Sequence, residues 1–377
     1  MEVADDFSSE EEDDMMISFV LDRNPRKHQK VTEEVSTAAI IPKLCRNISV
    51  YGLFEIVPAD ILSAIFSGWL TITDLSRLDI AVCNARSRCA YIDSLKWKGS
   101  AHYGSERPYG NDYIAWLSKR SILVRHYRGH KSFLTREAIM DINDHWNVCW
   151  SELTHLDLRY CAQMTPRLAL QIASLSSKLI LLNLSTCRIT DSELLRVSSA
   201  LSCLQSLCIM GNKKISDNSV ITVAQNCPLL QSLDLSFCQR ISEFGLLDIF
   251  NSLPLLINLR LRGLDSFTNK ALVHLSKKCG YIESLDLLHC ENISLTTLLS
   301  SSRLWPLHSL DLPYQHTVAD IGLILEIATY NDSLTNLNIL HYPTISVSLM
   351  HHYPCINFYR TSKSAFMNHH FTIEENV

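Results

Sequence analysis

One short pattern, Leu-x-x-Leu-x-Leu, recurs eight times between residues 153 and 339, with isoleucine in place of leucine in some copies. The middle leucine of each copy follows the previous one after 25, 26 or 27 residues. A spacing this regular marks a repeat protein, in which each copy is one structural unit that packs against its neighbours. The middle leucines are Leu156, Leu182, Leu207, Leu233, Leu259, Leu285, Leu310 and Leu337.

Each repeat has room for one strand and one return helix. The last two leucines of a frame alternate with other residues, as on one face of a strand. Segments between the frames, such as 168–176 and 218–227, place apolar residues at intervals of three and four, which favours a helix with one buried face. The sequence therefore predicts an α/β solenoid over 151–360, a leucine-rich-repeat horseshoe with parallel strands on the concave face and helices outside.

A cysteine or an asparagine stands three residues after the last leucine of several frames. Such a residue can be a metal ligand, a nucleophile or a packed turn residue. Cysteine metal sites use close pairs such as C-x-x-C, which this chain lacks although it has 13 cysteines, and a nucleophile needs a partner base and exposure. Recurrence at one repeat position favours packing, with a hydrogen bond to the turn backbone. These turn residues are Cys161, Cys187, Asn212, Cys238 and Cys290.

The residues around each turn also predict where the helices begin and end. An isoleucine followed by a hydroxyl residue and an acid, as at 189–191 and 215–217, supplies a hydroxyl that caps the next helix. Before the next frame, Cys203, Cys227 and Cys279 are expected to close three of the helices.

This pattern, with cysteine at the turn and again before some strands, resembles the cysteine-containing leucine-rich repeats found in many F-box proteins. The resemblance covers about 153–350. Its departures are Leu264, Gln315 and Tyr342 at the turn position, together with Pro313 just past a strand. We expect those repeats to be irregular.

Residues 54–96 read as a second, helical module. Pro58 suits the first turn of a helix, and apolar residues then recur at helical spacing as far as Trp69. Thr73 or Asp74 can cap a second helix. Two or three short helices cannot bury this apolar surface alone, so the module needs a partner or the solenoid to pack on.

The order of apolar residues in this module resembles an F-box motif, with one extra residue at Gly68-Trp69 and with Arg86 where the motif usually has tryptophan. The resemblance implies that the helices bind the Skp-type adaptor of a cullin ubiquitin ligase. The alternative is a helical cap that only stabilises the repeats. The adaptor-binding residues that the resemblance implies are Pro58, Ile61, Leu62, Ile65, Phe66, Leu70, Leu75, Leu78 and Val82.

The residues that flank the frame leucines are expected to line the concave face and to bind a partner. Aspartates in the middle of a frame are common in such repeats, whereas Arg260 and Arg262 are less ordinary and could anchor an acidic or phosphorylated segment. The candidates are His155, Asp157, Arg159, Asp234, Arg260, Arg262, Asp286 and Asp311.

The rest of the chain sets its expected organisation. Residues 1–50 form an acidic tail and linker, because eight acids and no Lys or Arg fall within the first 14 positions. Residues 111–150 read as an amino-terminal cap or degenerate repeat, and 361–377 as a carboxy-terminal tail. Without a signal-like start or a long apolar run, we expect a cytoplasmic or nuclear protein, not a membrane one.

Function is expected to be noncatalytic. The chain lacks the catalytic and nucleotide-binding motifs HExxH, GxSxG, GxGxxG and the P-loop, and the short basic segment 22–30 has no aromatic interleaving for nucleic acid. The adjacent histidines at 351–352 and 369–370 point to different sides and suit a metal poorly. We therefore expect no cofactor and no metal.

The order of the two modules resembles that of F-box/leucine-rich-repeat subunits. It implies an SCF-type substrate-recognition subunit whose partners are a Skp-type adaptor, a cullin and a protein substrate. The alternative is a non-ligase leucine-rich-repeat scaffold for protein interactions in which 54–96 is a structural cap. A GTPase activator fits less well, because the repeats of that family are longer.

Overall fold

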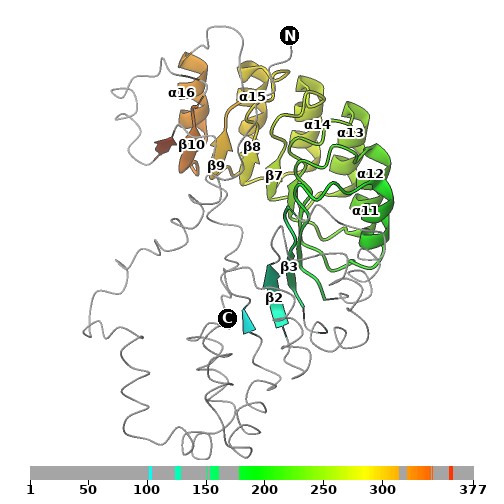
Figure 1. The fold of residues 1–377 in the computed structure, drawn as a ribbon. Helices are drawn as coiled ribbons and strands as arrows, with labels where there is room; N and C mark the ends of the chain where they lie inside the picture. The colour runs from blue at the N-terminus through cyan, green and yellow to red at the C-terminus, as the bar shows by residue number, and fades with distance from the viewer. Residues whose placement is uncertain are drawn as a thin grey trace, which may run out of the picture. The chain divides into compact units, whose positions relative to one another are not determined.

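The computed structural model describes residues 102–103, 124–128, 151, 153–160, 178–313, 321–340, 342 and 356–359. Within these residues, eleven strands join one sheet whose order follows the chain, and all neighbours are parallel (Figure 1). The strands are β1 (His102–Tyr103), β2 (Val124–Arg128), β3 (His155–Asp157), β4 (Leu181–Asn183), β5 (Ser206–Cys208), β6 (Ser232–Asp234), β7 (Asn258–Arg260), β8 (Ser284–Asp286), β9 (Ser309–Asp311), β10 (Asn336–Asn338) and β11 (Asn357–Tyr359).

The middle leucine of every frame lies at the centre of a strand, in register with the middle leucine of the next. Leu233, for example, pairs with Leu207 on one side and with Leu259 on the other. None of the eight is more than 4% exposed. Burying a leucine contributes about 2 kcal/mol, so this ladder is a main source of stability. The predicted leucine-rich-repeat solenoid is confirmed.

Short helices alternate with the strands and form a layer along one face of the sheet (Figure 1). Each helix packs on the next one in the chain. In α14 the buried residues Ala271, Leu272 and Leu275 lie on one side, which explains the helical spacing in the sequence. The helices are α11 (Asp191–Ser198), α12 (Asp217–Asn226), α13 (Glu243–Ser252), α14 (Asn269–Lys278), α15 (Leu295–Ser302) and α16 (Ile321–Tyr330).

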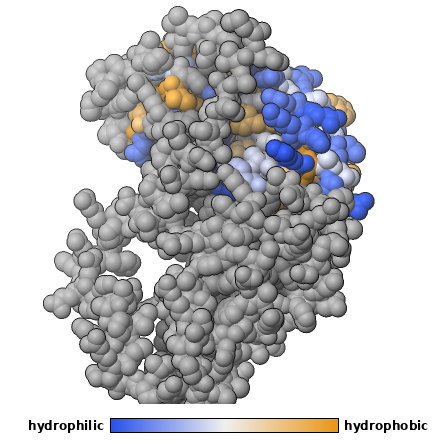
Figure 2. All heavy atoms as spheres, in the orientation of Figure 1, coloured by the Kyte–Doolittle hydropathy of each residue, from blue (hydrophilic) through white to orange (hydrophobic). Residues whose placement is uncertain are grey.

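The outer surface of this layer is mixed. Figure 2 shows hydrophilic residues gathered around α12 to α14 on the visible face, with apolar residues among them. No helix in the described part of the chain is long and apolar enough to cross a membrane. The F-box-like module at 54–96, like residues 1–50 and 361–377, lies outside the described residues.

A hydroxyl residue precedes each of the helices α11 to α15, as the sequence predicts. Ser242 accepts a hydrogen bond from the Gly245 amide at 3.3 Å, which satisfies one of the free amides at the start of α13. Thr268 and Ser294 accept the equivalent bonds at α14 and α15. The N-cap residues are Thr190, Ser216, Ser242, Thr268 and Ser294.

A polar staple also links the start of each helix from α11 to α14 to the next repeat. Asp191, the first residue of α11, accepts from the Ser216 amide at 2.8 Å and from its hydroxyl at 2.6 Å. The same contacts recur one repeat later between Asp217 and Ser242. The residue after the capping hydroxyl, an acid in three repeats and asparagine in a fourth, therefore fastens neighbouring repeats together. The stapled pairs are Asp191–Ser216, Asp217–Ser242, Glu243–Thr268 and Asn269–Ser294.

The turn cysteines are buried and bond to the preceding repeat. The Cys238 thiol donates to the carbonyl of Ile209 at 3.3 Å, and the Cys290 thiol to that of Leu261 at 3.1 Å. Packing with a turn hydrogen bond is therefore confirmed, while Cys161 lies outside the described residues. The equivalent bonds run from Cys187 to Leu158 at 2.9 Å and from Asn212 to Leu184 at 2.8 Å.

Burial keeps these thiols protonated. Loss of hydration raises the pKa of Cys238 and of Cys290 to about 12. A thiol with such a pKa is a hydrogen-bond donor at neutral pH, whereas nucleophilic attack and metal binding both need the thiolate.

One predicted helix end is wrong. Cys227 and Cys279 cap α12 and α14, but α11 ends at Ser198 and Cys203 is exposed. Leu201, fully buried, stands three residues before its frame leucine, where Cys227 stands in the next repeat. The interior site needs an apolar side chain and accepts either residue.

The Asp191 staple predicts acid sensitivity. Burial raises the pKa of Asp191, but hydrogen bonds from Ser216 and Ser219 outweigh it, so the net pKa is lower than usual. A carboxylate with a lowered folded-state pKa stabilises the fold above its unfolded pKa, and that stability is lost as pH falls through the folded pKa.

The variant Asp191→Asn should therefore unfold at lower urea than the wild type at neutral pH, and this difference should shrink below about pH 4. Asn269, which already holds Ser294 without a charge, shows that the site accepts an amide. Urea unfolding followed by circular dichroism from neutral to acid pH measures the difference. A gap that stays constant over this range would contradict the assignment.

Candidate binding face

Each strand turns its middle leucine toward the helices, so the residues on either side of that leucine face the opposite way. We call the surface they form the open face. The position after the leucine runs across it as one column of polar residues from strand to strand. That column is Asp157, Asn183, Cys208, Asp234, Arg260, Asp286, Asp311 and Asn338.

Most aspartates and asparagines in this column accept a hydrogen bond from a backbone amide just past the end of their own strand. The Asp234 Oδ1 atom accepts from the Ser236 amide at 2.9 Å, and that of Asp286 from the Leu288 amide at 3.1 Å. A side chain that binds the amide two residues on forms an Asx-type turn. Asp234 and Asp286 therefore have a structural role, whereas Asp311 cannot make this turn because Pro313, two residues on, has no amide hydrogen. The equivalent acceptors are Asp157, Asn183 and Asn338.

Cys208 and Arg260, the other two types in the column, both approach Asp234. The Cys208 thiol donates to Asp234 Oδ2 at 3.3 Å, and Arg260 Nη1 lies 3.6 Å from the same oxygen. Burial and the charge of Asp234 raise the pKa of Cys208 well above its usual value, which keeps the thiol a donor. Asp234 is thus held from both neighbouring strands.

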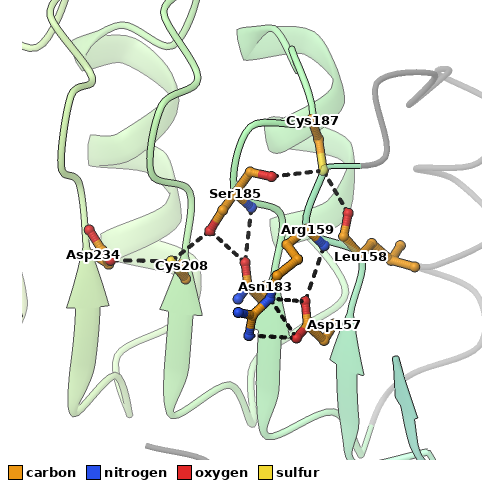
Figure 3. A network of polar contacts seen from close by, with 8 residues as sticks. All are labelled: Asp157, Leu158, Arg159, Asn183, Ser185, Cys187, Cys208 and Asp234. Atoms are coloured by element: carbon orange, nitrogen blue, oxygen red, sulfur yellow. Dashed lines mark hydrogen bonds and ion pairs between the residues drawn. The ribbon is translucent and has the colours of Figure 1, made fainter. Parts of the chain in front are cut away.

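The contacts continue toward β3 as one polar network (Figure 3). The Ser185 hydroxyl donates to Asn183 Oδ1 at 2.6 Å and lies 2.9 Å from the Cys208 sulfur. These bonds cross from β4 to β5, and the Cys208 bond to Asp234 extends them to β6. A network this satisfied fixes its side chains in position.

The arginines of the open face are paired with acids. Arg159 Nε and Nη2 grip the Asp157 carboxylate, with Nη2 at 2.7 Å. Burial alone would lower the pKa of Arg159, but the charge and hydrogen bonds of Asp157 outweigh it and raise the pKa. Arg262 Nη2 lies 2.9 Å from Asp286 Oδ2. The carboxylates of the sheet thus hold the guanidinium groups in place.

The eight residues predicted for the concave face lie in the strands of this sheet or just after them, but they differ in access. The adaptor-binding residues predicted between Pro58 and Val82 lie outside the described residues. Asp286 and Asp311 are 1% and 0% exposed, whereas the side chains of Arg159, Arg260 and Arg262 keep 15%, 19% and 17%. The structure brings two sets together: Asp157 with Arg159, and Asp234 with Arg260 beside Arg262 with Asp286. His155 lies at the start of β3 and is half-buried.

The leucine frame in the sequence places Asn183, Ser185 and Cys208 on the concave face, but the candidate binding residues do not include them, although they form the centre of the network in Figure 3. Their signal was the column itself, because Asn183 and Cys208 occupy the repeat position of Asp157 and Asp234. No group of three or more His, Cys, Asp or Glu placed to hold a metal occurs among the residues that the structure describes.

Comparison with known proteins gives structural likeness only. No family model matches the sequence, and no curated protein matches it. The chain is similar to a chain of the yeast Rad7–Elc1 complex, at 12% identity over 88% of this chain and 99% of that one, with a TM-score of 0.39. It is also similar to the leucine-rich repeat-containing protein LegL7 of Legionella pneumophila, at 18% identity over 63% of this chain and 79% of that one, with a TM-score of 0.41. The fold assignment rests on the leucine ladder of the sheet itself.

Proposed function

We propose that this protein is a noncatalytic substrate-recognition subunit of an SCF-type cullin-RING ubiquitin ligase. Residues 54–96 bind the Skp-type adaptor, and the open face binds the protein target. The observation that carries the proposal is the order of the two modules in the sequence, an F-box-like apolar pattern followed by cysteine-containing leucine-rich repeats.

The open face supports the target-binding half of the proposal. Its side chains are polar, are fixed by their own network and are not covered by the helix layer. Side chains held in place before binding lose little entropy when a partner docks. Direct contacts fall to the residues with accessible surface, namely His155, Arg159, Arg260 and Arg262, while the buried aspartates position the arginines.

Copurification with a Skp-type adaptor tests the proposal. The full-length chain should bind the adaptor, and the double variant Ile65→Asp, Phe66→Asp should lose binding by about 10-fold or more, since two charges would be buried in an apolar contact. A matched control changes two exposed leucines of the solenoid, Leu229→Asp and Leu304→Asp, and should bind normally.

Circular dichroism of each variant shows whether the repeats remain folded. If the wild-type chain does not associate with the adaptor, or if the module variant and the control bind alike, the ligase role is wrong. The protein is then a leucine-rich-repeat scaffold without a ligase link.

A further inference from the structure

A row of cations lies at the edge of the solenoid where three consecutive strands, β4, β5 and β6, lead into their turns. The cations occupy the loop just after the turn cysteine or asparagine, and all are exposed. Backbone bridges from Thr190 to Lys214 and from Ser216 to Arg240 show that these loops lie side by side. We call the row the basic strip. It consists of Arg188, Lys213, Lys214 and Arg240.

The cations of the basic strip differ from the arginines of the open face because no carboxylate among the described residues forms an ion pair with them. Within the part of the chain that the structure describes, Arg188, Lys213 and Lys214 make no ion pair. Arg240 donates to the Lys214 carbonyl at 3.3 Å, a contact that leaves its charge in place. By contrast, the arginines of the open face each have a carboxylate partner.

Two acids follow the loops of the basic strip in the sequence, and both hold a serine of the next repeat. Asp191 holds the amide and hydroxyl of Ser216, and Asp217 holds those of Ser242. These hydrogen-bond donors are neutral, so both carboxylates keep their charge, and the charge of Arg240 helps to lower the pKa of Asp191. Four cations against two acids leave a surplus of positive charge on these loops, which a negatively charged partner would balance.

The basic strip is short. At the equivalent loop positions of the next two repeats stand Asp265 and Glu291, both exposed, so the sign of the charge reverses. Neighbouring strands lie about 4.8 Å apart, so three repeats offer about 10 Å of positive edge. A ligand for this edge carries a few negative charges. A long polyanion such as a nucleic acid would meet the acidic loops and a chain of net charge −5.

An exposed aromatic residue follows the last cation of the strip in the sequence. Phe244, the second residue of α13, is four residues beyond Arg240 and 66% exposed, the highest value among the exposed large apolar side chains of the described residues. Aromatic and arginine side chains are the types that most often carry the binding energy of protein interfaces. An exposed apolar side chain only four residues from Arg240 favours a peptide over a purely ionic ligand.

We propose that the basic strip and Phe244 form a docking surface for a short acidic segment of a partner protein, one that also carries an apolar side chain. The inference rests on the proposed protein-binding function and adds a second contact surface at the edge of the sheet. Because Arg260 and Arg262 are paired with Asp234 and Asp286, the basic strip is the better site for an acidic segment than the open face.

Fluorescence anisotropy tests this with the full-length chain and a short labelled peptide of Asp and Glu with one central Leu. The wild-type chain should bind this peptide, binding should weaken as salt rises, and the same peptide with Asn and Gln in place of the acids should bind at least about 10-fold more weakly. A labelled single-stranded oligonucleotide serves as the competing class of ligand.

Charge reversal locates the surface. The double variant Lys213→Glu, Lys214→Glu should weaken peptide binding by about 10-fold or more, and Phe244→Ser by several-fold. Lys277→Glu, Lys278→Glu in the last turn of α14 makes the same charge change at exposed positions away from the strip and should bind like the wild type.

The inference is overturned if the wild-type chain does not bind the peptide, if the control pair weakens binding as much as the strip pair, or if the oligonucleotide binds more tightly than the peptide. Adaptor copurification of the strip variants separates the two proposals. Adaptor binding without peptide binding removes only the docking surface, whereas peptide binding without adaptor binding removes only the ligase role.

Discussion

Replacing Asn212 with alanine is expected to lower the free energy of unfolding by about 3 kcal/mol. The side chain is fully buried and makes three hydrogen bonds. Its Nδ2 donates to the carbonyls of Leu184 and Ile209, each at 2.8 Å, and its Oδ1 accepts from the Ile189 amide at 3.1 Å. Alanine leaves the Ile189 amide without its acceptor, whereas the Leu184 and Ile209 carbonyls lose their shortest bonds but still accept from the amides of Cys187 and of residue 212 at 3.4 Å. The unsatisfied amide costs about 2 kcal/mol, and the two lost carbonyl bonds cost about 0.5 kcal/mol each.

Urea unfolding at neutral pH, followed by circular dichroism, measures this loss. Asn218→Ala in α12 is a matched control, because Asn218 is exposed and its side chain holds no turn, and it should change stability by less than about 0.5 kcal/mol. Asn212→Cys should recover part of the loss, since other repeats place cysteine at this position. If the alanine and cysteine variants unfold at the same urea concentration, the side-chain hydrogen bond at residue 212 does not contribute to the free energy of unfolding.

The solenoid could be predicted because its cause is local and repeated. A leucine at the centre of each strand has only one direction in which to be buried, so a regular spacing of 26 residues is enough to specify a stacked sheet. Two turn positions that depart from the pattern, Tyr342 and Leu264, still fill the interior site of the turn. Tyr342 donates its hydroxyl to the Pro313 carbonyl at 2.7 Å, 29 residues back, as Cys238 and Cys290 do to their own acceptors. Leu264 fills the site with an apolar side chain and is fully buried.

The polar contacts of the open face could not be predicted in the same way. Asp157, Asp234 and Asp286 look like binding residues in the sequence, but each first closes its own strand end and then neutralises a cation. Whether a carboxylate is available depends on side chains 24 to 26 residues away, such as Arg262 for Asp286 and Cys208 for Asp234. The leucine frame predicts which way a side chain points, but it does not predict which side chain of a neighbouring repeat will bond to it.

The edge of the sheet gives a second example, because side chains of successive turns cover one another. The residue before each turn position from Cys161 to Cys290, Leu264 included, has a positive φ angle, and glycine precedes the turn position in two repeats. Gly263 is one of them, and a Cβ atom there would lie 2.6 Å from two ring carbons of Phe237 in the preceding repeat. Phe237 thus lies over the backbone of the next turn and leaves space only for glycine.

The variant Gly263→Ala is therefore expected to lose about 2 kcal/mol of unfolding free energy. The positive φ of 63° contributes part of the loss, but Tyr160, Thr186 and His289 adopt similar angles at equivalent positions, so the backbone tolerates a side chain. The larger part comes from the contact with the ring. In a Phe237→Ala background, where the ring is absent, the same glycine substitution should cost about 1 kcal/mol or less.

Four proteins complete this comparison: the wild type, each single variant and the double variant, all unfolded in urea. Gly280→Ala is the matched control, because a Cβ there meets nothing within 4 Å, and it should shift stability by less than about 0.5 kcal/mol. A coupling energy near zero, with the glycine substitution costing the same in both backgrounds, would show that strain in the backbone and not the Phe237 ring makes glycine necessary. A clear coupling would instead show that one repeat selects the residue of the next through a side chain, a constraint that sequence periodicity does not reveal.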